Sequence, residues 1–347
     1  MRGEMRALVK AEPGPGAKMV AVSIPAVGPR DVLVKVQAAS VCGTDLHIYD
    51  WDPWAQSRIK LPRRFGHEFA GEVVEVGGQV TSYAPGDLVS ADSHIACGVC
   101  HQCTSGKSHI CANLSILGVD VDGIFAEYAA IPASSLWRND PSLPPDVACV
   151  QDALGNAVYA VLAEEVAGKS VAIFGCGPAG LFSVGVARAS GAWPIFLVAK
   201  HEYRAAIGRQ MGATETLLAS EDVVGSIKKA TEGAGVEVVL EMTGSPSAIK
   251  QGFEVLSKGG RFTAFGIPSE PLTLDLANSV IFKGAKVLGI NGRLMFQTWH
   301  QMAALLRSGA LDPRPVITHR FPFEQYEEAF ALMRSPERRC GKVVLLP

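Results

Sequence analysis

The sequence predicts an α/β protein of two domains, a mostly antiparallel, barrel-like β domain and a doubly wound parallel sheet. Its 347 residues exceed the usual size of one domain. From about residue 30 to 135, short apolar runs alternate with Gly/Pro turns, whereas from about 155 to 298 apolar runs alternate with helical stretches. The change falls near Pro144-Pro145. We therefore expect domains at residues 1–152 and 153–298, with 299–347 returning to the first domain.

The first domain is predicted to be built from short strands, at residues 32–37, 70–76 and 87–90. Val32, Val34 and Val36 alternate with other residues at a period of two, which is typical of a strand with one solvated face. Several such strands separated by tight turns predict a barrel-like, mostly antiparallel domain.

The second domain is predicted to consist of β-α-β units. The expected strands are 170–174, 193–199, 236–242, 260–264 and 285–289, and the expected helices include 178–190 and 202–211. Strands that alternate with helices form a parallel sheet. A helix at 299–308 then precedes strand-like segments at 315–321 and 342–346.

Composition excludes several function classes. The chain is 48% hydrophobic and 19% charged, which excludes an intrinsically disordered protein. A formal net charge of −2 argues against broad binding to nucleic acid or to anionic membranes. The longest uncharged stretch, 170–187, is broken by glycines and a proline, so we expect a buried strand and helix there and no membrane span. No apolar segment follows the N-terminal charges, so we expect no secretory signal and a cytoplasmic protein.

Four of the eight cysteines form a close cluster inside a polar lobe, residues 94–113. The spacing is Cys97-x2-Cys100-x2-Cys103-x7-Cys111. Four thiolates at this spacing suit one tetrahedral zinc ion, and similar runs hold iron–sulfur clusters, so the spacing leaves both open. The lobe has little apolar content, and we expect a metal to order it.

A glycine motif follows the first strand of the second domain. Gly175, Gly177 and Gly180 have the spacing G-x-G-x-x-G and stand between a buried strand and a helix. In that context the first glycine permits a sharp turn, the second lets a pyrophosphate approach the backbone, and the third allows close helix–strand packing. The helix N-terminus adds amide donors. The motif predicts a Rossmann dinucleotide site.

The second strand of this domain ends without the acidic residue that usually binds the ribose 2′-hydroxyl of NAD. That position is Ala199, Lys200 follows it, and Arg204 lies five residues beyond Ala199. A basic residue without a carboxylate favours NADP. A solvent-facing Lys200 is the alternative, so the residues leave NAD and NADP both open.

Ligand-type residues for a second metal occur in the first domain. Cys42 is followed by Thr44, and His67-Glu68 lies downstream. Cysteine, histidine and a carboxylate are the ligands of an open catalytic zinc site. Zinc lowers the pKa of an alcohol and so favours loss of hydride to a nicotinamide. Thr44 and His47 are suited to relay the released proton.

Taken together, these motifs resemble the zinc-dependent medium-chain dehydrogenase/reductase family over the whole chain. The resemblance rests on Gly66-His67-Glu68-x2-Gly71-x5-Gly77-x2-Val80, the Gly86-Asp87 turn, the four-cysteine lobe and the Rossmann glycines, in that order. It implies a GroES-like catalytic domain followed by a Rossmann domain. It also implies a catalytic zinc on Cys42, His67 and Glu68, and a structural zinc in the lobe on Cys97, Cys100, Cys103 and Cys111.

Within the family, segment 42–54 and Phe265-Gly266-Ile267-Pro268 are most similar to members that oxidise the 3-hydroxyl of L-threonine to 2-amino-3-oxobutyrate. This resemblance implies a relay through Thr44 and His47, with Asp152 near the metal tuning proton transfer, and a cytoplasmic homotetramer that uses NAD. The residues expected to line the dinucleotide, besides the three glycines, are Ala179, Ala199, Lys200, Arg204, Phe265, Gly266, Ile267, Ile290 and Asn291.

Two alternatives are kept beside this interpretation. One is a related polyol or vicinal-diol dehydrogenase, which would use the same chemistry on another small molecule. The other is a catalytically silent nucleotide-binding module. Such modules typically lose metal ligands, and the presence of Cys42, His67 and Glu68 argues against this second alternative.

Overall fold

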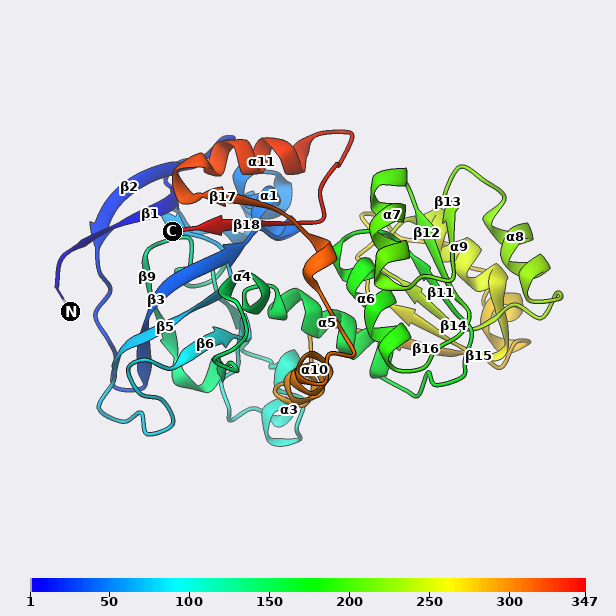
Figure 1. Ribbon diagram of the computed structural model, residues 1–347, viewed down its shortest axis with the longest axis horizontal. Coiled ribbons are helices and arrows are strands. Elements are labelled where there is room, and N and C mark those ends of the chain that lie inside the picture. The colour runs from blue at the N-terminus through cyan, green and yellow to red at the C-terminus, as the bar shows by residue number, and fades with distance from the viewer. Residues whose placement is uncertain (1) are drawn as a thin grey trace. The chain divides into compact units, whose positions relative to one another are not determined.

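The computed structural model describes residues 2–347 and divides them into two compact units (Figure 1). The first unit comprises residues 2–152, Ile317–Arg338 and Lys342–Pro347, and the second comprises Ala153–Val316 and Arg339–Gly341. The first unit is therefore made of segments that are far apart in the sequence.

The first unit is built on β-sheets, as predicted. Its main sheet has the order β10-β6-β5-β3-β18-β17, with β9 also pairing with β3, and a second sheet has the order β2-β1-β4. Neighbouring strands are antiparallel except for the parallel pair β17 and β18. The strands are β1 (Glu4–Lys10), β2 (Lys18–Ser23), β3 (Asp31–Ser40), β4 (Arg63–Arg64), β5 (Glu68–Val76), β6 (Leu88–Ala91), β9 (Tyr128–Pro132), β10 (Leu136–Arg138), β17 (Ile317–Pro322) and β18 (Lys342–Leu346).

Short helices and one small hairpin complete this unit. The helices are α1 (Gly43–Asp50), α2 (Pro53–Arg58), α3 (His101–Thr104), α4 (Pro145–Ala148) and α11 (Tyr326–Arg334), and the hairpin pairs β7 (His94–Ile95) with β8 (Ser115–Ile116). The hairpin closes the base of the four-cysteine lobe. The C-terminal strand β18 pairs with β3 through Val344 and Ser40, so the late segment Lys342–Leu346 lies beside the chain that leads to Cys42 (Figure 1).

The second unit contains a six-stranded parallel sheet in the order β13-β12-β11-β14-β15-β16, which confirms the predicted Rossmann fold. The strands are β11 (Val171–Phe174), β12 (Ile195–Ala199), β13 (Glu215–Leu218), β14 (Val236–Glu241), β15 (Leu256–Ala264) and β16 (Lys286–Gly289). The helices are α5 (Gln151–Leu162), α6 (Pro178–Ala189), α7 (Glu202–Met211), α8 (Val223–Ala230), α9 (Pro246–Val255) and α10 (Gln297–Arg307).

The hydrophobic core of this unit is supplied largely by its buried strands. Phe174, Phe196 and Phe262 are each at most 2% exposed, and the Phe262 ring stacks on Phe253 of α9 at 4.0 Å. Strands buried on both faces read as continuous apolar runs, which is the pattern on which the prediction relied. The second strand begins at Ile195, two residues later than predicted, because Trp193 is 66% exposed and Pro194 has no amide hydrogen.

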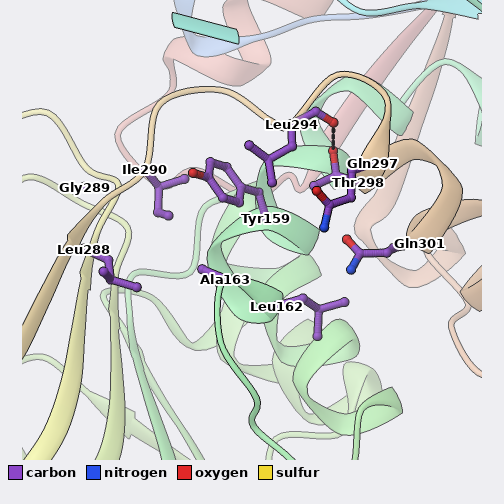
Figure 2. A pocket seen from close by; sticks show the side chains of 10 residues that line it. All are labelled: Tyr159, Leu162, Ala163, Leu288, Gly289, Ile290, Leu294, Gln297, Thr298 and Gln301. Carbon is purple, nitrogen blue, oxygen red and sulfur yellow. Dashed lines mark hydrogen bonds between the residues drawn. The ribbon is translucent and has the colours of Figure 1, made fainter. Parts of the chain in front are cut away.

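The second unit extends beyond residue 298. Thr298 and Gln301 of α10 lie near Tyr159 and Leu162 of α5, around a cavity of about 300 Å³ (Figure 2). The chain returns to the first unit at Ile317, where β17 begins, and residues 299–316 belong to the second unit. Among residues 2–347, no helix is long and apolar enough to cross a membrane.

Candidate active site and nucleotide site

The structure brings Cys42, His67 and Glu68 together. Cys42 is the N-cap residue of α1, and Glu68 is the first residue of β5. The sulfur, one imidazole nitrogen and one carboxylate oxygen all lie within 4.8 Å of one another. His67 and Glu68 are buried and Cys42 is half-buried, so one side of the cluster is accessible.

Glycines make this arrangement sterically feasible. Gly66, directly before His67, has φ +86°, and a Cβ there would lie 2.6 Å from the Phe125 ring. A Cβ on Gly71 would lie 2.3 Å from the Lys35 carbonyl oxygen of β3. These two positions therefore let β5 approach β3 closely and let the chain turn sharply into the ligand pair.

Asp45 supports the cluster and was not predicted from the sequence. Its carboxylate is completely buried, and one oxygen accepts a hydrogen bond from the Cys42 backbone N–H at 2.8 Å. The other oxygen faces His67 Nδ1 at 3.6 Å. A carboxylate behind a metal-binding histidine orients the ring. The local signal was the acidic residue three positions after the helix cap.

Lys342, also not predicted, forms a buried ion pair with Glu68. Its ammonium and the Ser40 hydroxyl both donate to the same Glu68 carboxylate oxygen, and the Lys342 and Glu68 side chains are at most 2% exposed. Burial alone would raise the pKa of Glu68, but the Lys342 charge outweighs burial and holds that pKa below its usual value. Glu68 is thereby kept as a carboxylate, the form that binds a metal.

These observations fit a zinc ion. The donor set contains a thiol, an imidazole and a carboxylate, the three ligand types that open catalytic zinc sites use. The buried Asp45 Oδ1 and His67 Nδ1 have no hydrogen-bond partner within 3.5 Å. Because the two atoms face each other, the Asp45 carboxylate would orient the imidazole when His67 binds a metal.

The predicted relay residues lie on α1. Thr44 and His47 are three residues apart, so they occupy the same side of the helix. The Thr44 hydroxyl lies 3.9 Å from the Cys42 sulfur, and the His47 side chain is 57% exposed. Asp152, at the start of α5, accepts hydrogen bonds from the Ser93 backbone N–H and hydroxyl, and it stands outside the cluster of three metal-type ligands among the described residues.

The four cysteines of the lobe also converge. Their sulfurs lie within 4.8 Å of one another, and Cys100 Sγ is 3.5 Å from Cys103 Sγ. Backbone N–H groups lower the pKa of Cys97 to about 6, whereas burial and the neighbouring thiols raise the pKa of Cys103 to about 11. Four thiolates this close repel one another, and a divalent cation removes that repulsion, so the donor set fits a structural zinc.

The predicted nucleotide residues lie along one edge of the parallel sheet. The glycine motif follows β11, Ala199 ends β12, Phe265–Ile267 follow β15, and Ile290-Asn291 follow β16. Carboxyl ends of parallel strands share one edge, and the strand order reverses between β11 and β14. Dinucleotides bind at this topological switch point.

The glycine turn has the geometry that a pyrophosphate site needs. Gly175 has φ +114°, and a Cβ on Gly180 would lie 1.9 Å from the Gly175 carbonyl oxygen. Gly177, the N-cap residue of α6, faces open space and makes no side-chain cap hydrogen bond, so the first amide groups of the helix are accessible. Ala179 lies in this first turn.

The adenosine end of the site lacks a carboxylate. Ala199 is fully buried and Lys200 is exposed. The Arg204 guanidinium donates at 2.8 Å to the Cys340 carbonyl oxygen, so this residue has a structural contact within the second unit. Sequence reasoning missed the turn after β14, where the buried Glu241 carboxylate accepts hydrogen bonds from the backbone N–H groups of Thr243 and Gly244.

One cavity adjoins a predicted cofactor residue. Tyr159, Ile290, Leu294 and Thr298 contribute side chains to the 300 Å³ cavity of the second unit, and Figure 2 shows Tyr159 beside Leu294. Tyr159 is thus close to the end of β16, where the predicted dinucleotide contacts Ile290 and Asn291 lie.

Comparisons with known proteins agree with this geometry. Residues 28–141 match the family described as alcohol dehydrogenase GroES-like domain, and residues 178–308 match zinc-binding dehydrogenase. An L-threonine 3-dehydrogenase of Bacillus licheniformis is 49% identical over the full length of both chains. Two solved structures each align with 99% of this chain. The first is an alcohol dehydrogenase of Escherichia coli in complex with NADH, with 26% identity, a TM-score of 0.91 and 99% of its chain covered. The second is a zinc-binding dehydrogenase of Sinorhizobium meliloti bound to NADP, with 30% identity, a TM-score of 0.90 and 100% of its chain covered.

The matched families cover parts of both units, and the relative from Bacillus licheniformis matches over the full length of both chains. The chain therefore belongs to the zinc-binding alcohol dehydrogenases of the medium-chain dehydrogenase/reductase family, and it is an oxidoreductase that resembles the L-threonine 3-dehydrogenases over its whole length.

Proposed function

We propose that this dehydrogenase oxidises the 3-hydroxyl of L-threonine to 2-amino-3-oxobutyrate, with NAD as the hydride acceptor. The observation that carries the proposal is the cluster of Cys42, His67 and Glu68, built into a chain that is 49% identical to an L-threonine 3-dehydrogenase. Oxidation of this alcohol removes a hydride from C3 and a proton from the hydroxyl. The hydride passes to the nicotinamide, and the proton passes to solvent.

Cys42, His67 and Glu68 would hold the catalytic zinc. When bound there, zinc supplies Lewis acidity that lowers the pKa of the substrate hydroxyl. The chain's own residues prepare the site: Asp45 faces His67, and Lys342 keeps Glu68 ionised.

Thr44 and His47 would carry the proton outward. Thr44 is half-buried beside Cys42, and His47 is the next polar side chain on that side of α1 and is exposed. An exposed imidazole can take up a proton and release it to solvent. We assign Asp152 a supporting role in which its buried carboxylate orders the Ser93 segment.

The dinucleotide would bind along the edge formed by the glycine turn and the ends of β12, β15 and β16. Because Ala199 provides no carboxylate to repel a 2′-phosphate and Lys200 is exposed beside it, we propose that NADP is accepted more readily than by relatives with an acidic residue there.

A substrate panel tests the function. L-threonine, 2,3-butanediol and sorbitol are each assayed with NAD and NADP, and reduced cofactor is followed by absorbance. Turnover of threonine with NAD supports the proposal, and turnover of a diol without turnover of threonine contradicts it. Metal analysis separates an enzyme with about two zinc ions per chain from a silent module with about one.

We also propose a homotetramer located in the cytoplasm. The second unit exposes four large apolar side chains, on the edge strand β16 and in the segment before it: Leu276, Ile281, Phe282 and Val287. Exposed apolar side chains of this kind occur at protein interfaces. The eight cysteines are unpaired, which suits a reducing compartment. Light scattering of the wild type and of Phe282→Asp tests the assembly, because the charged variant should form smaller species.

A further inference from the structure

We propose that Asp52 is the positioning residue for His47: its carboxylate binds the imidazole through Nδ1 and leaves Nε2 as the nitrogen that takes up and releases a proton. The inference rests on the proposed function, in which His47 passes the substrate proton to solvent.

The contact itself is short and directional. Asp52 Oδ2 lies 2.5 Å from His47 Nδ1. An ionised carboxylate only accepts hydrogen bonds, so Nδ1 carries the hydrogen, and Nε2 is the nitrogen left to take up and release a proton. One ring nitrogen is therefore occupied by the protein, which fixes both the tautomer and the ring orientation.

A turn that the sequence does not reveal creates this contact. Trp51 ends α1 in the left-handed conformation, φ 57°, which is rare for a bulky residue. The turn reverses the chain, so the Asp52 backbone N–H donates to the His47 carbonyl oxygen at 3.3 Å. Residues 47 and 52 thereby meet, although five positions along a continuous helix would point them apart.

The buried Lys10 stabilises that turn. Its ammonium donates to the carbonyl oxygens of Gly14, Gly16 and Tyr49, with distances of 2.7 Å to Gly16 and 3.1 Å to Tyr49, and it lies 5.3 Å from the centre of the Trp51 ring. Lys10 is 1% exposed. The strained conformation of Trp51 is thus held by packing and by a cation–π contact.

The Asp52 carboxylate is held independently of the histidine. Asp52 is the N-cap residue of α2, and its Oδ1 accepts a hydrogen bond from the Ala55 backbone N–H at 2.9 Å. Burial would raise the pKa of Asp52, but the Ala55 N–H and the contact with His47 outweigh burial and lower that pKa. The two oxygens are therefore divided between a structural cap and the imidazole.

Other charged groups surround the same recess, a cavity of about 700 Å³. Asp50 from α1, Arg334 from α11 and Arg338 from the following segment line it together with His47 and Asp52. Asp50 is paired with Arg334 at 2.8 Å, and its charge is largely compensated. Asp52 is the carboxylate that contacts the imidazole, so its removal should have the larger effect on His47.

The test compares Asp52→Asn with Asp50→Asn in the zinc-loaded enzyme. Asparagine keeps the helix cap and the acceptor for Nδ1–H but removes the charge. We expect the fraction of His47 in the Nδ1–H tautomer, read from the ring ¹⁵N signals assigned with His47→Gln, to fall in Asp52→Asn, since a neutral amide holds the imidazole less firmly than a carboxylate does. We expect kcat to fall by about two- to fivefold because the pair is partly exposed, KM to change little, and Asp50→Asn to leave the tautomer and kcat near wild type.

Asp52→Ser provides a second measurement, because serine keeps the cap but is too short to reach the ring. It should lower kcat more than Asp52→Asn does. An unchanged His47 tautomer in both Asp52 variants overturns the inference. A changed tautomer with an unchanged kcat supports the contact but overturns the proposed relay, so the two failures are distinguishable.

Discussion

Replacing Lys342 by methionine should strongly destabilise the first unit when the metal is removed. Methionine has a similar length, so the change removes the ammonium from Glu68 and leaves little new cavity. Both side chains of the pair are at most 2% exposed. Glu68 would then be a buried carboxylate without its cation, although the Ser40 hydroxyl would still donate to it.

The size of the effect follows from the cost of the remaining charge. Loss of one partner from a buried ion pair typically costs about 3–5 kcal/mol. Glu68 can escape that cost by binding a proton, which at pH 7 costs about 3.4 kcal/mol, because pH 7 lies about 2.5 units above its usual pKa and each unit is about 1.36 kcal/mol. We therefore expect a loss of about 3 kcal/mol at pH 7.

The effect should depend on pH in a defined direction. In the wild type the pKa of Glu68 is lowered, so the pair stabilises the folded chain above the usual glutamate pKa and loses that contribution on acidification. In Lys342→Met, burial raises the pKa of Glu68, and the penalty shrinks as the pH falls. The difference between the two proteins should decrease to about 1.4 kcal/mol at pH 5.5.

Amide hydrogen exchange of β3 and β5, measured by mass spectrometry in excess chelator, reports the local free energy of opening. Lys286→Met is the matched control, because its pair with Glu164 is exposed and should be worth less than about 1 kcal/mol at either pH. The double variant Lys342→Met/Glu68→Gln should recover much of the loss. Equal protection in Lys342→Met and wild type, or a double variant no more stable than Lys342→Met, would refute the reasoning.

Three further predictions follow from the sites. Cys42→Ser should reduce turnover by at least about 10³-fold and bound zinc by about one ion per chain, with an unchanged circular dichroism spectrum; retained activity would exclude Cys42 from the metal site. Cys103→Ser should release the other zinc and make residues 94–113 sensitive to limited proteolysis, whereas an unchanged digestion pattern would show that the lobe does not need metal. Ala199→Asp should raise the preference for NAD over NADP by about tenfold or more, because an ionised carboxylate contributes about 1.5–3 kcal/mol to a hydroxyl hydrogen bond, and an unchanged preference would place the ribose elsewhere.

Local patterns predicted much of this molecule. The glycine motif, its strand and its helix are consecutive in the sequence, and the structure confirms β11 and α6 where they were expected. The two groups of metal-type ligands were predicted from residue type and spacing, and each group lies within 4.8 Å. The second unit also contains α8, which was not predicted, because its sequence VVGSIKKA mixes β-branched residues with a glycine.

The contacts that were missed depend on distant parts of the chain or on an unusual backbone. Lys342 and Glu68 are 274 positions apart in the sequence, and no local sequence pattern predicts their ion pair. Asp52 meets His47 only because Trp51 adopts a positive φ, which sequence reasoning assigns to glycine or asparagine. Asp45 was recoverable, since an acidic residue three positions after a helix cap is a recognised signal.

The first unit is made of segments that lie before and after most of the second unit in the sequence, so it cannot finish folding until the last segment has been synthesised. Strands β17 and β18 follow the main segment of the second unit, Ala153–Val316, in the sequence, yet they complete the sheet that supports Glu68. During synthesis on the ribosome, the second unit can fold first, while residues Ala39 and Ser40 of β3 still lack their partner strand β18. Lys342 is the first residue of β18, so its ion pair with Glu68 is among the last contacts to form. If translation stops before β18 leaves the ribosome, the nascent chain can therefore contain a folded Rossmann domain and an incompletely folded first unit.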